Sequence, residues 1–358
     1  MNLSAGGRWS WRYRSSTGKG KKRCWCGHMK SSDNPVKVLL VYYSYSSFVK
    51  NDYAILSKHF NVERFQWHGK ADLLRLALAV RRSDVTFVWF ASDHAAVTVF
   101  FSKIFGKPSI VIAGGGDVAY VPEIGYGAFT QSRFKQGLSR YALKNAELLL
   151  PVSDFTKSEV LQWARPRRME VVYNGVDVEL FRPKEKKEDL VVTIGKIMEP
   201  LMRRKGLETF ARASLHFPDY KFAIIGRTEG PSLSRLKEIN PDIISTGYLK
   251  DFELLRWLQR ARVYCQLSYY ESFGVALAEA MACGCVPVVT DRGALPEVVG
   301  DVGFYVLYGD ERATVIAIKQ ALELHGELVK RSRKRIVDTF SLGRRARELA
   351  KLVSPCEV

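Results

Sequence analysis

The chain has 358 residues, of which 47% are hydrophobic and 26% charged, which is the balance of a globular protein and excludes a disordered or fibrous one. This length exceeds one ordinary hydrophobic core, so we expect two domains. The formal net charge of +18 favours phosphorylated substrates, anionic membranes or nucleic acid as partners, without choosing among them. No run is a clean membrane span, because the most apolar one, residues 85–101, has Asp93 and His94 at its centre.

Residues 1–35 form a basic tail that we expect to be disordered and to have no catalytic role. The tail is rich in Gly, Ser, Lys and Arg and shows no hydrophobic period. Cys24, Cys26 and His28 have the spacing of half a zinc site, but no second half follows, so no metal is expected. The cysteines of the chain include no C-x-x-C pair, which is typical of a reduced, cytoplasmic protein.

From residue 36 onward, strands and helices alternate, which predicts parallel sheets covered by helices on both faces. In the first half we expect strands at 36–43, 62–66, 85–90, 108–113, 148–152 and 171–173, and helices at 49–59, 71–80, 94–105, 132–144 and 153–163. Ligands of such sheets bind beyond the carboxyl ends of the strands. The loops at 44–47, 91–94 and 114–117 are therefore candidates for a site.

A domain boundary is expected at Asn174-Gly175, ahead of a charged stretch. The second half has expected strands at 190–195, 221–226, 243–247, 263–267, 286–290 and 303–306, and helices at 207–215, 233–238, 252–261, 275–283, 313–325 and 328–339. The fold class is α/β, with an N-terminal domain (36–176), to which a C-terminal helix (342–358) returns, and a C-terminal domain (177–341). Two such domains leave a cleft between them, where a ligand commonly binds.

Residues 268–300 contain the most informative local pattern. Glu279 interrupts an otherwise apolar helix, and a buried carboxylate is unfavourable unless a group bonds to it. Glu271 precedes the turn at Gly274, beside a helix N-terminus whose free N–H groups favour an anion. Two carboxylates beside such a helix end suit a sugar–phosphate ligand. The alternative is structural, with Glu279 paired to a core Arg or Lys and Glu271 merely solvated.

Three segments in order resemble the GT4 family of retaining glycosyltransferases, from about residue 36 to the end of the chain. Glu271 and Glu279 match its E-x7-E signature, and residues 173–177 (YNGVD) match its inter-domain signature. The segment from Gly195-Lys196 to Lys205-Gly206 is similar to its G-[RK]-x…K-G motif. The resemblance implies the GT-B architecture of two doubly wound, Rossmann-like domains. It also implies a hexosyltransferase-type enzyme that moves a sugar from a nucleoside diphosphate to a hydroxyl acceptor with retention of configuration.

The resemblance further implies roles on the donor side. Glu279 would bond the donor ribose, and Glu271 the hydroxyls of the transferred sugar. Lys196 and Lys205 would neutralise the diphosphate, which lowers the barrier because the leaving phosphate gains negative charge. The chain has no D-x-D motif, so we expect a metal-independent reaction without a cofactor. The turn amides at Ser272, Phe273, Gly274 and Val275 would approach the sugar and the diphosphate of the donor. Tyr248 and Leu249 would line its nucleotide base.

The acceptor side departs from the family pattern. Its first loop has Ser44 and Ser47, both candidate substrate contacts, where many relatives have paired glycines. Asp117 follows three glycines where many relatives have a histidine, and it would act near the transferred sugar or be a solvated turn residue. His94 would line the acceptor side or be a structural histidine. The candidate catalytic residues are Lys205, Glu271 and Asp117.

The expected partners are a nucleotide-sugar donor and a sugar, lipid-linked or other hydroxyl acceptor. Helix 132–144 mixes basic residues with Phe134, so it would dock on an anionic membrane or be an ordinary solvated helix. We therefore expect a cytoplasmic protein that binds peripherally to the cytoplasmic face of a membrane. One alternative is a nucleotide-sugar epimerase on the same fold, although such enzymes use several cleft histidines and this chain has six in all. The other is a basic nucleic-acid-binding protein, which only the tail suggests.

Overall fold

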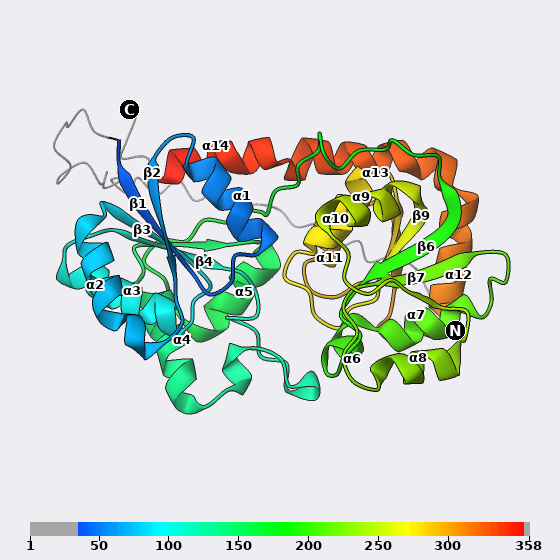
Figure 1. Cartoon of the computed structure of the whole chain (residues 1–358), viewed down its shortest axis with the longest axis horizontal. Coiled ribbons are helices and arrows are strands. Elements are labelled where there is room, and N and C mark those ends of the chain that lie inside the picture. The colour runs from blue at the N-terminus through cyan, green and yellow to red at the C-terminus, as the bar shows by residue number, and fades with distance from the viewer. Residues whose placement is uncertain (1–34, 354–358) are drawn as a thin grey trace, which may run out of the picture.

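The computed structural model describes residues 35–353, which form two parallel sheets with helices on both faces (Figure 1). The basic tail with Cys24, Cys26 and His28 lies outside the described residues. None of the helices in the described part combines the length and the apolar character that crossing a bilayer requires. The α/β class and the two-domain arrangement expected from the alternating pattern are confirmed.

The N-terminal sheet has the strand order β2-β1-β3-β4-β5, and all its neighbouring strands are parallel. Its strands are β1 (Lys37–Tyr42), β2 (Asn61–Gln66), β3 (Val85–Trp89), β4 (Ser109–Ala113) and β5 (Leu148–Pro151). Its helices are α1 (Ser47–Leu56), α2 (Leu73–Arg82), α3 (Asp93–Ile104), α4 (Arg133–Asn145) and α5 (Asp154–Trp163). Short 3-10 turns lie at Lys70–Asp72, Pro122–Ile124 and Ala128–Thr130.

Successive residues of β1 explain why this sheet is buried on both faces. Val38 and Leu40 pack in the cluster that contains α1 and the C-terminal helix, whereas Leu39 and Val41 pack in the cluster that contains α2, α3 and α4. A strand covered on both faces has to be apolar throughout, as the sequence run VLLV is.

The C-terminal sheet has the order β11-β10-β9-β6-β7-β8 and is also parallel. Its strands are β6 (Glu188–Ile194), β7 (Lys221–Ile225), β8 (Ile244–Ser245), β9 (Ala261–Gln266), β10 (Val286–Thr290) and β11 (Phe304–Val306). Its helices are α6 (Leu201–Lys205), α7 (Leu207–Ser214), α8 (Ser232–Ile239), α9 (Asp251–Arg260), α10 (Val275–Ala282), α11 (Leu295–Val299), α12 (Glu311–Glu323) and α13 (His325–Phe340).

The strand expected at 171–173 is wrong. This segment lies beside β5, where the Val172 N–H donates to the Pro151 carbonyl, but the pairing is limited to a single bridge between Leu149 and Met169. The chain then leaves the sheet at Asn174, which is why the β-branched pair at 171–172 does not extend into a strand. The helices α6 and α11 were not expected from the sequence.

Helix α14 (Leu342–Val353) returns the chain to the N-terminal sheet, where it packs against α1 (Figure 1). Arg345 of α14 forms a bidentate, buried ion pair with Asp52 of α1, at 2.6 and 2.7 Å. The same guanidinium donates to the carbonyls of Val172 and Tyr173, and Asp52 accepts from the Trp89 indole. One polar cluster thus joins α1, α14 and the segment where the chain crosses between domains.

Candidate functional site

A cavity of about 280 Å³ lies between the two sheets, beyond the carboxyl ends of their strands. This is where ligands bind in open parallel sheets. The N-terminal side of the cavity is lined by Ser47, Phe48, Trp89, Phe90, Gly114 and Asn174. The C-terminal side is lined by Lys205, Gln266, Glu271, Ser272, Phe273, Gly274, Val275, Ala276 and Glu279.

Glu271 is held by a network at the end of β9. Its Oε2 lies 2.6 Å from Lys205 Nζ and accepts from Gln266 Nε2 at 3.0 Å. Burial acts to raise the pKa of Glu271, but the charges of Lys205 and Arg204 outweigh it and leave the pKa below its ordinary value. The carboxylate is therefore ionised and fixed in place, and the alternative of a merely solvated Glu271 is wrong.

Lys205 reaches this network because of the turn that follows α6. Gly206 has a left-handed φ of 64°, and a Cβ there would lie 2.1 Å from the Leu267 carbonyl oxygen. Only glycine allows this approach of the chain to the end of β9. Gly195 lies beside it, since a Cβ at Gly195 would be 3.3 Å from Lys205 Cγ.

Glu279 lies on α10, facing the cavity. No side chain or N–H group in the described part of the chain donates a hydrogen bond to its carboxylate, so the alternative of pairing with a core Arg or Lys is wrong. Burial, with a smaller contribution from the charge of Asp251, raises its pKa to about 8. Helix α10 begins after Gly274, whose φ is 87°, and the N–H groups of its first turn have no partner within the helix. The cavity thus offers an unsatisfied carboxyl next to a helix N-terminus.

Three further donor-side candidates do not line the cavity. Lys196 is exposed, forms no ion pair with a described residue and does not line the cavity. Tyr248 is 66% exposed, with the Arg227 guanidinium 5.0 Å from its ring centroid. Leu249 packs against the core. Of the two candidate lysines, the structure brings only Lys205 to the other candidates.

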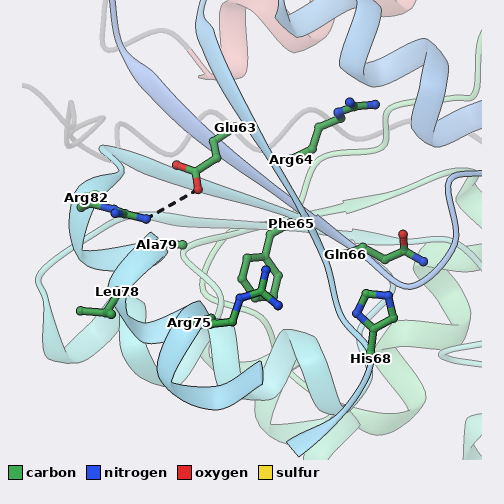
Figure 2. A pocket seen from close by; sticks show the side chains of 9 residues that line it. All are labelled: Glu63, Arg64, Phe65, Gln66, His68, Arg75, Leu78, Ala79 and Arg82. Atoms are coloured by element: carbon green, nitrogen blue, oxygen red, sulfur yellow. Dashed lines mark ion pairs between the residues drawn. The ribbon is translucent and has the colours of Figure 1, made fainter. Parts of the chain in front are cut away.

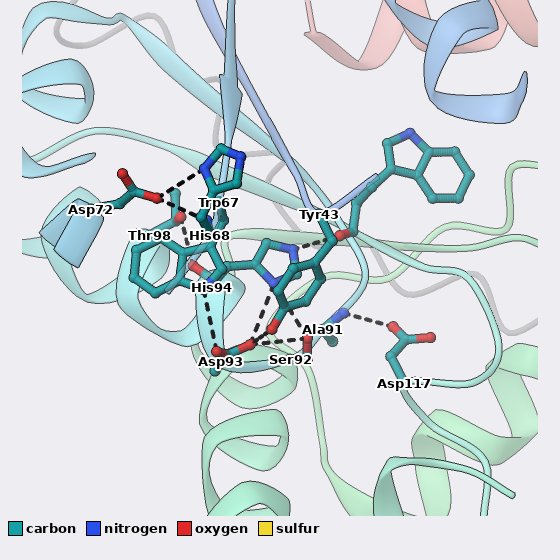
Figure 3. Close-up of polar contacts among 11 residues, drawn as sticks. Tyr43, Trp67, His68, Asp72, Ala91, Ser92, Asp93, His94, Thr98 and Asp117 are labelled. Atoms are coloured by element: carbon teal, nitrogen blue, oxygen red, sulfur yellow. Dashed lines mark hydrogen bonds and ion pairs between the residues drawn. The ribbon is translucent and has the colours of Figure 1, made fainter. Parts of the chain in front are cut away.

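His94 does not line the acceptor side. Its side chain is fully buried, with Nε2 2.7 Å from the Trp89 carbonyl oxygen and Nδ1 3.3 Å from Ser92 Oγ (Figure 3). Both ring nitrogens are therefore used within the N-terminal domain, and His94 is a structural residue. Of the two loop serines, Ser47 lines the cavity, whereas Ser44 is exposed and does not.

Asp117 is buried among backbone amides and does not face the cavity. Its carboxylate accepts from the Ala91 N–H at 2.7 Å (Figure 3). It also accepts from the N–H groups of Gly115 at 2.7 Å and Gly114 at 3.1 Å. These bonds join the loops that follow β3 and β4, so Asp117 positions the cavity wall instead of contacting a substrate. The alternative of a solvated turn residue is also wrong, since only 5% of the residue is exposed.

The cavity also contains residues that the sequence reasoning missed. Asn174 is 7% exposed and its Oδ1 has no partner. Gln266 is buried and donates to Glu271. Phe48 and Phe90 form much of the N-terminal wall. Asn174 lies within the YNGVD segment, so a signal existed for it, whereas nothing in the local sequence distinguishes the two phenylalanines from core residues.

The two domains touch directly around the cavity. Ser272 Oγ donates to the Gly114 carbonyl at 2.8 Å, and the Ser272 carbonyl accepts from Ser153 Oγ at 2.7 Å. Glu297 accepts from the N–H groups of Asp154 and Phe155, at the N-terminus of α5. The described conformation is therefore one in which the domains are closed on each other.

Comparison with known proteins finds similarity in the part of the chain that forms the donor side of the cavity. The model for group 1 glycosyl transferases matches residues 188–324, the part that supplies Lys205, Glu271 and Glu279. The chain is 34% identical over 165 residues to MMP alpha-(1->4)-mannosyltransferase of Mycolicibacterium hassiacum, covering 43% of this chain and 39% of the relative. The C-terminal domain of the chain is therefore similar to the group 1 glycosyltransferases.

The chain is also 27% identical over 266 residues to GDP-mannose:cellobiosyl-diphosphopolyprenol alpha-mannosyltransferase of Xanthomonas oryzae pv. oryzae. That alignment covers 70% of this chain and 67% of the relative. Among solved structures, Anabaena HepE in complex with UDP and glucose superposes with a TM-score of 0.74 at 16% identity, over 90% of this chain and 100% of that chain. The chain thus has the GT-B fold expected from the sequence.

Proposed function

We propose that this protein transfers a hexosyl group from a nucleoside diphosphate sugar to a hydroxyl acceptor, with retention of configuration and without a metal. The observation that carries the proposal is the unpaired carboxyl of Glu279, which lies in one cavity with Lys205, Glu271 and the N-terminus of α10. A ribose supplies the hydroxyl donors that Glu279 lacks. A diphosphate supplies the anion that the lysine and the helix end favour.

The chemistry assigns a role to each group. As the bond from the anomeric carbon to the phosphate oxygen breaks, negative charge grows on the diphosphate, and Lys205 and the α10 amides stabilise that charge. Glu271, fixed by Lys205 and Gln266, accepts hydrogen bonds from hydroxyls of the transferred sugar. The departing phosphate takes the proton of the acceptor hydroxyl, which attacks the same face. Retention is supported by the E-x7-E resemblance.

The first test is a thermal-shift screen of nucleotide sugars, followed by a transfer assay with the donor that stabilises the protein. At a hundredfold excess over Kd, a donor adds about 2.7 kcal/mol to the free energy of unfolding. With that donor, Lys205→Met should lower kcat/KM by about 10²- to 10³-fold, because it removes a charge next to the leaving group.

Lys196→Met is the matched control, since that lysine is exposed outside the cavity, and it should change kcat/KM far less. Full activity of Lys205→Met would contradict the proposal. Isomerisation of the donor sugar without any acceptor would instead identify an epimerase.

We also propose that the acceptor is presented at an anionic membrane surface, on the cytoplasmic side. Helices α2, α3 and α4 pack side by side and expose an apolar surface formed by Leu74, Leu78, Phe100, Ile104 and Phe134. Next to it, a shallow cavity between β2 and α2 has Arg75 beside Phe65, together with Arg82, which lies 3.9 Å from Glu63 (Figure 2). Guanidinium groups beside apolar side chains suit phospholipid headgroups. The Xanthomonas relative is named for a diphosphopolyprenol-linked substrate, which supports a lipid-linked acceptor.

A further inference from the structure

The acceptor half of the cavity has no charged side chain. The six residues that the N-terminal domain contributes to the cavity lining are aromatic, hydroxyl, amide or glycine. Among all the residues that line the cavity, the one basic side chain is Lys205, which lies 2.6 Å from Glu271 on the donor side. An acceptor that carried a phosphate or carboxylate into this half would be desolvated without a cation to pair with it, which is strongly unfavourable.

Phe48 and Phe90 instead give this half a fixed aromatic wall. Their ring centroids are 5.7 Å apart with the planes at 87°, and Phe48 also packs 4.6 Å from the buried Trp89 ring. Phe90 has a φ of 73°, the sole positive value among the non-glycine residues of the described chain. A bulky residue in this region stores strain, which typically marks a functional site.

Gly114 provides the space for the Phe90 ring. A Cβ at Gly114 would lie 2.3 Å from Cε1 of the Phe90 ring, so the glycine is the space into which the ring fits. The ring is thereby held against the loop after β4, with its remaining surface facing the cavity. Flat aromatic surfaces of this kind pack against the apolar C–H face of a pyranose ring, whose hydroxyl groups lie along the edge of the ring.

Asn174 supplies a polar group for that hydroxyl edge. It is almost fully buried where the chain crosses between domains, lines the cavity, and its Oδ1 has no hydrogen-bond partner. A buried polar atom without a partner is rare in a native structure, and a bound ligand that donates a hydrogen bond would satisfy it. A neutral hydroxyl satisfies it, whereas a phosphate or carboxylate, which only accepts hydrogen bonds, does not satisfy an acceptor oxygen.

We propose that the acceptor residue bound in this cavity is a neutral pyranose, which packs its apolar C–H face against the aromatic wall of Phe48 and Phe90 and donates a hydroxyl to Asn174. The inference rests on the proposed transferase function and names the substrate class of the same site. In the reaction, the acceptor oxygen bonds to the anomeric carbon, the bond from that carbon to the phosphate oxygen breaks, and the acceptor proton leaves on the phosphate. The phosphate of a lipid-linked acceptor then lies outside the cavity, at least one sugar away from the reacting hydroxyl.

The test compares matched acceptors with the donor found by the thermal-shift screen. Methyl mannopyranoside and methyl glucopyranoside are the neutral acceptors, and mannose 6-phosphate and inositol 1-phosphate are the anionic ones. We expect kcat/KM to be at least about a hundredfold higher for a neutral acceptor, as desolvating an unpaired anion requires. Equal or preferred transfer to an anionic acceptor overturns the inference and leaves the transferase function standing. Absence of both donor binding and slow donor hydrolysis overturns the transferase function itself.

Substitutions of Phe48 and Asn174 then test whether the acceptor contacts these residues. Phe48→Leu keeps the apolar volume and removes the flat face, so it should raise the KM for the neutral acceptor about tenfold while changing the donor KM less than about twofold. Asn174→Ala should raise the same acceptor KM. Phe252→Ala, which truncates an exposed phenylalanine of α9 outside the cavity, is the matched control and should change neither KM. An unchanged acceptor KM in both Phe48→Leu and Asn174→Ala overturns the inference.

Discussion

Glu279 combines a proposed binding role with a cost in stability. Its pKa is raised to about 8 in the folded protein, against an ordinary value of 4.5. Between these two pH values the folded state binds the proton more tightly than the unfolded state, so the contribution of Glu279 to stability falls as the pH rises through this window. Glu279→Gln should therefore leave Tm unchanged near pH 4.5 and raise it by a few degrees above pH 8, where each kcal/mol shifts Tm by about 2–4 °C. Calorimetry across this pH range measures the difference.

Glu271→Gln provides a control of opposite sign. The pKa of Glu271 is lowered by Lys205 and Arg204 despite its burial, so its stabilising contribution is present above its ordinary pKa and is lost as the pH falls through the lowered value. Glu271→Gln should thus lower Tm at neutral pH, and the Tm of the variant should approach that of the wild type at acidic pH. If Glu279→Gln lowers Tm at pH 8, the carboxyl has a partner and the interpretation of the site is wrong.

The role of a single residue could be predicted from the sequence where its local neighbours determine its contacts, and not where its partners come from distant loops. Glu279 was predictable because its helical neighbours are small and apolar, so any contact of the carboxyl had to come from a ligand or a distant residue. Asp117 and His94 were not, because their partners are backbone groups of loops that only the folded sheet brings together. The two lysines of one motif lie apart because Lys205 ends α6, whereas Lys196 lies ahead of that helix.

Among the elements, the loops at the mouth of the cavity set how closely the domains approach. Gly115 has a φ of 123°, and a Cβ there would lie 2.2 Å from the Cβ of Ser272 in the other domain. We expect Gly115→Ala to prevent closure and to lower kcat/KM for transfer by at least about a hundredfold, since misplacement by about 1 Å has such an effect. Small-angle scattering with the donor should show a more open molecule than the wild type.

Gly69→Ala is the matched control. Gly69 has a similar φ of 138°, but a Cβ there would have no atom within 4 Å, so the variant has the backbone strain without the clash. If both variants lose the same activity, backbone strain and not domain contact is responsible.

Strands and helices could be predicted where their burial leaves a regular apolar pattern in the sequence. Apolar runs such as VLLV identify strands buried on both faces, and all but one of the expected strands are present. The segment at 171–173 failed because its run ends where the chain changes domain. Helices α6 and α11 have five residues each, too few to show a helical period.

At the scale of the whole molecule, the apolar surface of α2, α3 and α4 should determine where the enzyme works. We expect the full chain to sediment with vesicles containing an anionic phospholipid and not with neutral ones, and the binding to weaken with salt. Phe134→Asp should weaken vesicle binding by about tenfold while leaving transfer to a water-soluble acceptor unchanged.

Phe252→Asp is the control for that experiment, because Phe252 is 61% exposed on α9 of the other domain. Equal losses for the two variants would indicate a nonspecific effect of charge. Loss for neither variant would place the membrane contact elsewhere or remove it.

The return of α14 also bears on how the chain is made. The C-terminal sheet is built from one continuous stretch of chain, but the N-terminal sheet lacks α14, with the guanidinium that pairs with Asp52, until the last helix is synthesised. At about 5–20 residues per second, the roughly 190 residues from β5 to Arg345 take about 10–40 s to translate. During that time Asp52 is a carboxylate in an apolar setting without its partner. The domain that emerges first from the ribosome is therefore the one that matures last.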